Sequence, residues 1–426
     1  MRLLIMGSPT SKALESFGNS GKVNGGGWIE NLIINLSKKE DLEIYVCFYY
    51  DSINIPTKKY FENIYYIALP IRVKGLQNCN NEMIEDLKWA YEESSPDIVH
   101  IIGTEREHNL KLLEIANPKR TIVSITGMVT YCSIHYYGGI EEKNFKNLSL
   151  GDILRHGGPI REKRLFERYS ISEKQLIRNA KYVTGRTTWD YACVKQLNPN
   201  IKYTYCSEIL NDVFYRNSWN LNKIERYRIF VSQGSYPLKG LHKLFEALPT
   251  ILKYYPDTEV YIAGPNILDD STLMKKIKRT TYAKYLKKLI TELKLPFSKI
   301  HFTGPLDYNG MLEQYLKANV FVLPSIIENS PNSLGEAMNL GMPCVSSCVG
   351  GIQDMLRDKV DGFLYPYDES YMLSYYVCKI FGDDELAEQI GKNARESAIE
   401  RFDINRTIDI TYDLYNRVLK DVNNDK

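Results

Sequence analysis

Two glutamates in the C-terminal half of the chain, Glu328 and Glu336, are separated by seven residues in a segment with a strand, turn and helix pattern. The apolar run 320–324 predicts a buried strand, and polar residues lead from it into a short helix. A helix N-terminus carries unpaired backbone N–H groups and the positive end of the helix dipole. The segment therefore predicts an anion site with a carboxylate on either side.

The limits of this helix can be predicted from its capping residues. Ser330 is a favourable N-cap, and Pro331 suits the first helical position because its missing N–H would have no partner there. Gly341 and Pro343 predict where the helix ends. We interpret the segment as a site for the diphosphate of a nucleotide sugar.

A lysine and two glycine turns in the same half could complete such a site. Lys239 lies near the end of the loop 232–240, after a predicted strand, and its ammonium could neutralise a departing diphosphate. Gly264 and the segment 302–306 follow two neighbouring predicted strands. Open α/β sheets bind ligands beyond the carboxyl ends of their strands, so we expect these turns to frame a base and ribose.

Three consecutive glycines, 25–27, precede a predicted helix that runs to Leu36. Glycine permits close approach of the backbone to a ligand, but a flexible loop is an equally good reading of the triplet. Its spacing does not match the dinucleotide fingerprint, so a nicotinamide cofactor is not supported.

The composition is that of an ordinary globular protein: 44% of the 426 residues are hydrophobic, 25% are charged, and the net charge is +2. Such a balance gives no reason to expect a nucleic-acid partner. The eight cysteines are dispersed without a CxxC pair, so neither a zinc cluster nor a disulfide framework is indicated. The N-terminal apolar run is too short for a signal peptide and no apolar run could span a membrane, so we expect a cytoplasmic protein.

Strand-like and helix-like segments alternate along the chain, which predicts α/β domains with parallel sheets. We expect an N-terminal domain over 1–216, a second domain over 217–402, and a terminal helix over 403–426 that returns to the first domain. Nine strands are expected, at 2–6, 42–48, 98–102, 121–125, 182–185, 228–231, 260–263, 300–303 and 344–346, in addition to 320–323.

Three further segments carry structural expectations. Residues 127–158 have no clear periodicity and predict an irregular loop. Residues 160–181 predict a charged helix, and residues 276–293 predict one amphipathic helix. Basic side chains between 155 and 181 leave open a peripheral contact with an anionic membrane, although the interspersed glutamates favour a solvated face.

The glutamate pair with Glu-Ala-Met and Gly-Met-Pro after it resembles the E-x7-E signature of glycosyltransferase family 4. Further matching marks are Lys239-Gly240, Gly264, Gly304, Gly350-Gly351 and Asp361-Gly-Phe-Leu364. The resemblance spans almost the whole chain and is strongest over 229–402. It implies a GT-B fold, with two Rossmann-like domains facing across a cleft, and a retaining transferase of the kind that builds bacterial surface polysaccharide.

The resemblance also implies roles for individual residues. Glu336 would hold the ribose hydroxyls, Glu328 would contact the donor sugar, and Lys239 would clamp the diphosphate, so that no metal is required. The acceptor, a glycan or a lipid-linked glycan, would bind to the N-terminal half. The implied catalytic residues are Glu328, Lys239 and His135. The implied donor-binding residues are Gly26, Gly27, Gly234, Lys239, Gly264, Leu306, Glu328, Asn329, Ser330, Asn332, Ser333, Leu334 and Glu336.

Two departures from the family pattern bear on the chemistry. Many members carry an arginine just after the glycine of the lysine loop, where this chain has Ser235. Many also place a histidine directly after the strand at 121–125, where this chain has Thr126, and His135 lies nine residues further on. His100, on a predicted strand, is as readily a packed residue as a functional one.

Two rival functions follow from these observations. One is a GT-B-like sugar epimerase, which would need carboxylates and histidines in the N-terminal half. The other is a non-catalytic nucleotide- or sugar-binding protein that keeps the fold, since fold alone does not guarantee activity. The donor base, the sugar and the acceptor are not specified by these motifs.

Overall fold

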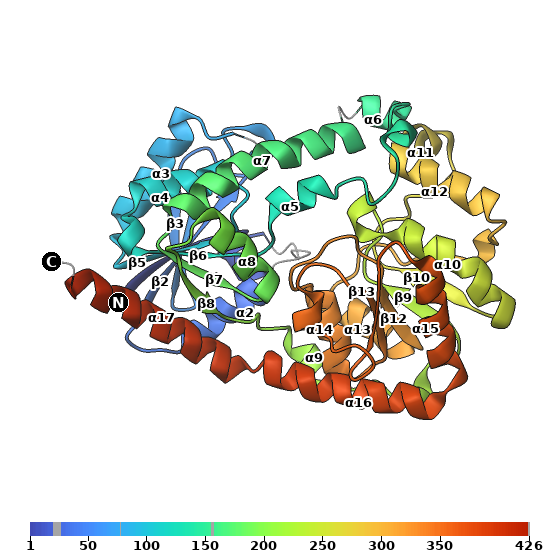
Figure 1. The fold of residues 1–426 in the computed structure, drawn as a ribbon. Coiled ribbons are helices and arrows are strands. Elements are labelled where there is room, and N and C mark those ends of the chain that lie inside the picture. Colours follow the sequence, from blue (N-terminus) through green and yellow to red (C-terminus); the bar gives the residue numbers. More distant parts are fainter. Residues whose placement is uncertain (20–26, 77, 155–156, 425–426) are drawn as a thin grey trace. The chain divides into compact units, whose positions relative to one another are not determined.

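The computed structural model describes residues 1–19, 27–76, 78–154 and 157–424. Its contacts divide the chain into two compact units. Unit 1 comprises residues 1–130, 167–211 and 402–426, and unit 2 comprises residues 131–166 and 212–401. Figure 1 shows a sheet in each unit with helices packed around it.

Unit 1 is built on an eight-stranded sheet with the order β3-β4-β2-β1-β5-β6-β7-β8. Its strands are β1 (Arg2–Met6), β2 (Glu43–Tyr50), β3 (Thr57–Phe61), β4 (Ile64–Pro70), β5 (Ile98–Ile102), β6 (Thr121–Ser124), β7 (Tyr182–Gly185) and β8 (Lys202–Tyr205). The predicted parallel sheet is confirmed, with one antiparallel pair added at its edge, β3 with β4. The pair β3–β4 is joined by a tight turn at Glu62 and Asn63, both with positive φ, which permits antiparallel pairing without a crossover.

The core of unit 1 lies on and around its central strands. Leu3 and Ile5 of β1 are fully buried and belong to one cluster with residues of β2 and of the helix α2 (Gly27–Leu36). The last helix, α17 (Ile404–Asn424), adds Tyr415 and Val418 to that cluster. The predicted return of the C-terminal helix to the N-terminal part of the chain is therefore confirmed, because α17 buries its apolar face there.

Unit 2 carries a six-stranded sheet with the order β11-β10-β9-β12-β13-β14. Its strands are β9 (Arg228–Val231), β10 (Glu259–Ile262), β11 (Ile300–Phe302), β12 (Val320–Leu323), β13 (Cys344–Ser347) and β14 (Phe363–Tyr365). Every pair is parallel, and the central strands β9, β12 and β13 are buried throughout. Burial on both faces explains why these strands read as continuous apolar runs in the sequence. The predicted α/β class with two Rossmann-like sheets is confirmed.

Several helices connect or cover the strands of unit 2, and the sequence did not predict all of them. The helices of unit 2 in this part of the chain are α9 (Asp212–Arg216), α10 (Leu241–Tyr254), α11 (Leu273–Ile277), α12 (Thr281–Glu292), α13 (Tyr308–Lys317), α14 (Asn332–Leu340), α15 (Ser370–Gly382) and α16 (Asp384–Arg401). The amphipathic helix expected over 276–293 is present as α12, but its predicted start is wrong, because residues 276 and 277 belong to the separate helix α11. Thr280 caps α12 by accepting a hydrogen bond from the N–H of Ala283, which starts a new helix at that point.

Residues 127–158 are also more regular than expected. They contain α5 (Val129–Ile134), a 3-10 turn at Glu142–Phe145 and α6 (Leu150–Leu154), before α7 (Pro159–Asn179) begins. Short helices of five or six residues give too little periodicity to be recognised in a sequence. By contacts, residues 131–166 belong to unit 2, although they lie between two segments of unit 1 in the sequence. The predicted domain limits, and the roles assigned to the two domains, stay predictions.

Candidate functional site

The segment with the two glutamates folds as a buried strand, a turn and a helix. Strand β12 ends at Leu323, and α14 begins at Asn332 with Pro331 as its N-cap. The prediction that Ser330 caps this helix is wrong by one residue, because Pro331 adopts the extended conformation expected of an N-cap. Gly341 ends the helix at φ 78°, as predicted. As a proline, Pro331 supplies no side-chain capping hydrogen bond to α14.

The structure brings Lys239 and Glu328 together. Lys239 Nζ lies 2.7 Å from Glu328 Oε1, and the hydroxyl of Ser325 donates to the same oxygen at 2.8 Å. The side chains of Lys239 and Glu328 are 20% and 13% exposed, so the pair is mostly shielded from water while still open to a ligand. Among the described residues, Oε2 of Glu328 accepts no hydrogen bond, which leaves it available to a sugar hydroxyl.

Two glycines allow the backbone approaches that hold this ion pair in place. A Cβ on Gly240, which has φ 66°, would lie 1.7 Å from the carbonyl oxygen of Pro324. A Cβ on Gly350 would lie 1.9 Å from the carbonyl oxygen of Glu328, and the N–H of Gly351 donates to that oxygen at 3.0 Å. Glycine is required at both positions because any side chain would push the lysine loop or the glutamate loop away.

The electrostatics of Lys239 follow from its surroundings. Burial disfavours the ammonium, but the nearby carboxylate of Glu328 outweighs burial and raises the pKa of Lys239. The ring of Tyr236 lies 5.8 Å from Lys239 Nζ, and burial raises the pKa of this phenol. Lys239 is therefore a permanent cation at neutral pH, as a clamp for a diphosphate must be.

Glu336 occupies a different environment from Glu328. The hydroxyl of Tyr315 lies 2.9 Å from Glu336 Oε2 and 3.0 Å from the carbonyl oxygen of Ser333. Burial raises the pKa of Glu336 to about 7, and the hydrogen bond from Tyr315 opposes that change only in part. Tyr315 has one proton for two acceptors, so a protonated Glu336 can donate to Tyr315 while Tyr315 donates to Ser333.

The two glycine turns expected to frame a base lie side by side. The N–H of Gly264 donates to the carbonyl oxygen of Gly304 at 3.0 Å, and the two residues form an isolated bridge. Both have positive φ, and a Cβ at either would meet nothing within 4 Å. Open space beside the ends of β10 and β11 fits a ligand there. Leu306 is partly buried near this turn, whereas Gly234 is close-packed, since a Cβ would lie 2.6 Å from Leu241 Cδ2.

Not every predicted site residue joins this group. Gly26 lies outside the described residues, and Gly27 is the first residue of α2 in unit 1. Leu334 is fully buried and its N–H donates to Pro331, so its side chain belongs to the core. His135 is exposed, and among the described residues no hydrogen bond links it to Lys239 or Glu328.

The remaining predicted donor-binding residues lie along the turn and the first helical turn. Asn329 and Ser330 are buried, while Asn332 and Ser333 are partly exposed at the start of α14.

Sequence reasoning missed three residues that shape the site: Ser325, Tyr315 and Tyr236. Ser325 directly follows the apolar strand and its proline, a position from which a serine can cap the turn, so this residue carried a local signal. Tyr315 sits on α13 at the helical spacing of a core residue, and nothing in its local sequence indicates a partner 21 residues away. Tyr236 is one of 32 tyrosines and carries no distinguishing pattern.

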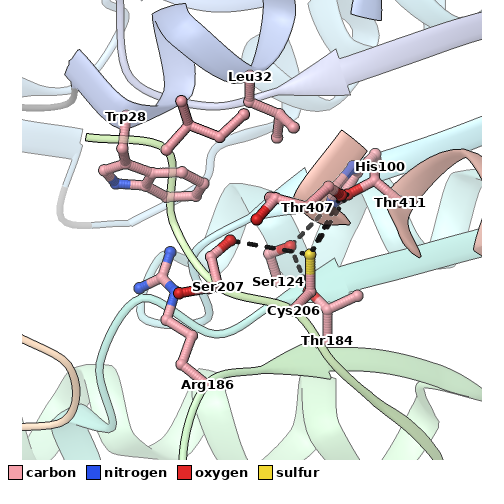
Figure 2. Close-up of a pocket in the computed structure, with 11 residues that line it drawn as sticks. Trp28, Leu32, His100, Ser124, Thr184, Arg186, Cys206, Ser207, Thr407 and Thr411 are labelled. Atoms are coloured by element: carbon pink, nitrogen blue, oxygen red, sulfur yellow. Dashed lines mark hydrogen bonds between the residues drawn. The ribbon is translucent and has the colours of Figure 1, made fainter. Parts of the chain in front are cut away.

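A small polar cavity lies inside unit 1 (Figure 2), with a volume of about 20 Å³, room for about one water molecule. His100 lies 2.8 Å from the hydroxyl of Tyr415 and 2.6 Å from that of Ser124, which lies 2.6 Å from Thr184 Oγ1. Burial lowers the pKa of His100 to about 4, so the ring is neutral. His100 is therefore a packed, hydrogen-bonded core residue.

At the same cavity, Arg186 is held between a carboxylate and a ring. Its Nε lies 3.1 Å from Glu208 Oε1, and its guanidinium lies 4.4 Å from the centre of the Trp28 ring. Both members of the ion pair are almost completely buried. Figure 2 shows Trp28 and Arg186 on the cavity wall. A cavity of this size cannot hold a sugar.

The described residues contain no cluster of three or more His, Cys, Asp or Glu side chains placed to hold a metal ion. None of their helices combines the length and apolarity needed to cross a membrane.

Comparison with known proteins identifies relatives of this chain. Residues 213–397 match the family model described as Glycosyl transferases group 1. An uncharacterized glycosyltransferase of Methanocaldococcus jannaschii is 27% identical over 202 residues, 47% of each chain. The UDP-Gal:alpha-D-GlcNAc-diphosphoundecaprenol alpha-1,3-galactosyltransferase of Escherichia coli is 31% identical over 111 residues, 26% of this chain and 28% of that protein. The chain thus matches about half or less of the length of these curated relatives.

Solved structures resemble the chain over nearly its whole length. The sucrose-phosphate synthase of Thermosynechococcus elongatus superposes with a TM-score of 0.72 at 16% identity, covering 98% of this chain and 99% of that one. HepE of Anabaena, solved in complex with UDP and glucose, gives a TM-score of 0.65 at 16% identity over 98% and 99% of the two chains. At this identity the likeness shows the fold, which is the predicted GT-B fold.

Proposed function

We propose that this chain, whose residues 213–397 match the glycosyl transferases group 1 family model, transfers a sugar from a nucleoside-diphosphate sugar to an acceptor hydroxyl, with retention at the anomeric carbon. The observation that carries the proposal is the ion pair of Lys239 and Glu328, in which Glu328 belongs to the turn that leads into α14. A cation and the backbone amides of a helix N-terminus suit a diphosphate, and a carboxylate with an open oxygen suits a sugar hydroxyl.

Each group has a separate task in this scheme. The N–H groups of Asn332 and Ser333 and the dipole of α14 take up phosphate charge. Glu336 accepts hydrogen bonds from the ribose hydroxyls, and Oε2 of Glu328 accepts one from the transferred sugar. The turns at Gly264 and Gly304 leave room for the base.

Lys239 changes partner during the reaction. In the empty site its charge is matched by Glu328. As the bond between the anomeric carbon and the diphosphate breaks, negative charge grows on the leaving oxygen, and a fixed ammonium at that point stabilises it. Because the protein supplies this charge, the reaction is expected to proceed without a divalent metal.

The names of two similar proteins indicate which substrates to test first. HepE was solved with UDP, and the Escherichia coli relative acts on a sugar linked to diphosphoundecaprenol. We therefore propose a UDP-sugar donor and a glycan or lipid-linked glycan acceptor. A lipid-linked acceptor would bring the protein to a membrane surface.

The test is release of free nucleotide from a panel of UDP-, GDP- and ADP-sugars, measured with and without acceptor. We expect turnover with one class of donor and strong loss of turnover in Glu328→Ala and Lys239→Ala. Nucleotide binding without turnover of any donor, in the presence of a panel of glycan and lipid-linked acceptors, would refute a transferase.

A second candidate, a non-catalytic nucleotide- or sugar-binding protein, is favoured by two observations. The family's arginine is replaced by Ser235, and His135 is exposed without a link to the ion pair. This candidate predicts that Glu328→Ala alters nucleotide-sugar affinity and nothing else.

A further inference from the structure

A second pocket lies in unit 2, beside the lysine loop. Its volume is about 360 Å³, within the range of about 300–1,000 Å³ that is usual for small-molecule sites. One wall comes from residues 136–166, and the other comes from Ser235, Tyr236 and Pro237 together with the start of α12. None of the donor-binding residues predicted from the sequence lines this pocket.

Aromatic rings form most of its apolar surface. Tyr136 and Phe166 pack edge to face with their centres 5.0 Å apart, and Tyr236 packs in the same apolar cluster. Tyr136 is buried, whereas Phe166 and Tyr236 are only partly buried, so these two rings are the ones that a ligand would touch. Flat rings of this kind offer an apolar face to the C–H side of a pyranose.

The polar groups of the pocket are carboxylates and hydroxyls. Glu162 accepts a hydrogen bond from the hydroxyl of Tyr136 through Oε2, and among the described residues its Oε1 accepts none. Asp152 is buried and fixed, since its Oδ2 accepts a hydrogen bond of 2.6 Å from the N–H of Thr281. Ser235 and Thr280 add hydroxyl groups.

Charge narrows the class of ligand. The described residues that line the pocket include two acids and no lysine, arginine or histidine. Two lysines close to lining residues in the sequence have other partners: Lys163 lies 4.9 Å from the ring of Tyr137, and Lys239 pairs with Glu328. A phosphorylated ligand would meet like charge here, whereas a neutral or amine-bearing sugar would find acceptors for its hydroxyl groups.

The pocket is connected to the donor residues through one loop. Tyr236 lines the pocket, and its ring centre lies 5.8 Å from Lys239 Nζ. In the same loop the carbonyl oxygen of Leu238 accepts a hydrogen bond from the N–H of Ile326, two residues before Glu328. A sugar in the pocket would therefore lie next to the predicted site of the transferred sugar.

We propose that this pocket is a carbohydrate subsite that binds a neutral or amine-bearing sugar ring of the acceptor, stacked on Phe166 and Tyr236 and hydrogen-bonded to Glu162. The inference rests on the proposed function for the identity of the sugar as an acceptor. The binding of the sugar itself depends only on the pocket.

The binding test uses saturation-transfer NMR with methyl glycosides of glucose, galactose, glucosamine and N-acetylglucosamine, and with glucose 1-phosphate and uridine as contrasting probes. We expect at least one methyl glycoside to bind. Phe166→Leu, which keeps apolar volume and removes the flat ring, and Glu162→Gln, which keeps an acceptor for Tyr136, should each weaken it at least fivefold. Arg161→Ala, an exposed change on the same helix, is the matched control and should have no effect.

Three outcomes would overturn the subsite: no methyl glycoside binds, the two variants bind it as the wild type does, or the two variants weaken binding of glucose 1-phosphate or uridine as much as they weaken binding of the glycoside. Far-UV circular dichroism and UDP affinity, both unchanged, establish that the variants are folded.

A kinetic measurement separates this inference from the proposed function. With an active donor and acceptor pair, both variants should raise the acceptor KM at least fivefold and leave hydrolysis of the donor in water unchanged. If glycosides bind and respond to the variants while no donor turns over, the subsite stands and the transferase proposal fails. If donors turn over and the acceptor KM does not move, the subsite is refuted and the transferase stands.

Discussion

Replacing Glu336 by glutamine tests the proposal that this residue binds the ribose. The substitution removes the charge, so it should stabilise the folded protein at high pH and at the same time weaken the binding of UDP. Burial raises the pKa of Glu336 from an ordinary 4.5 to about 7. Between these two values the folded protein holds a proton that the unfolded chain has released, so the free energy of unfolding falls as the pH rises through this window. The destabilisation caused by the charged carboxylate of Glu336 is absent below about pH 4.5 and complete above about pH 7.

The size of the effect follows from the same two values. Each pKa unit corresponds to about 1.4 kcal/mol, so the shift from 4.5 to about 7 sets a ceiling of about 3 kcal/mol on the cost of the charged form. The side chain is partly exposed, and screening by solvent lowers the cost of the charged form. We therefore expect Glu336→Gln to be more stable than the wild type by about 1–3 kcal/mol at pH 8.5 and by little at pH 5.

The assay is urea unfolding of both proteins at pH 5 and pH 8.5, with Glu396→Gln, an exposed change on α16, as the matched control. UDP binding, measured by thermal shift at pH 8, should weaken about tenfold or more in Glu336→Gln, since a charged acceptor contributes about 1.5–3 kcal/mol to a hydrogen bond. Wild-type affinity should rise as the pH increases through about 7, because the ribose hydroxyls donate to the carboxylate. A stability difference that does not change with pH, or unchanged UDP affinity, would contradict the reasoning.

Three further predictions concern the lysine loop and the metal. Lys239→Ala should lower the rate of donor turnover about 100-fold, the usual effect of removing one group that stabilises transition-state charge. The control Lys253→Ala, exposed on α10, should not change the rate. Equal rates in the two variants would exclude a role for Lys239 in the reaction. Gly240→Ala should destabilise unit 2 by about 2–4 kcal/mol in urea unfolding, because its Cβ would lie 1.7 Å from the Pro324 carbonyl oxygen, whereas Gly341→Ala, also at positive φ but with ordinary contacts, should cost only about 1–2 kcal/mol. Transfer measured in excess EDTA should equal transfer in Mg²⁺, and full loss that Mg²⁺ restores would show that the lysine and the α14 amides do not suffice.

Much of the fold could be predicted from the sequence because its signals are local. Parallel strands buried on both faces appear as continuous apolar runs, and β1, β5, β7, β9 and β12 were predicted with the bounds that the structure gives. The long helices α7 and α17 have enough turns for their periodicity to be read. The short helices between 127 and 158 have too few residues for their periodicity to be recognised, and the break between α11 and α12 depends on the capping hydrogen bond at Thr280.

The candidate site also has features that could be predicted from the sequence and features that could not. The sequence by itself determined the types and order of the groups that we propose bind the donor, with Glu328, Glu336 and Lys239 each following a readable strand or loop signal. Only the tertiary structure decided that Lys239 and Glu328 pair through one oxygen, because they lie 89 residues apart and meet only when β9 and β12 become neighbours. Only it decided that Glu336 is partly buried beside Tyr315, which raises its pKa to about 7.

The tertiary structure also decided that His135 is exposed and that residues 136–166 form one wall of a second pocket in unit 2. The physical reason is general. A helix N-terminus or a glycine turn is specified by adjacent residues. Burial depends on contacts between segments that are distant in the chain, and burial in turn sets the pKa of a side chain and which of its hydrogen-bonding atoms remain without a partner.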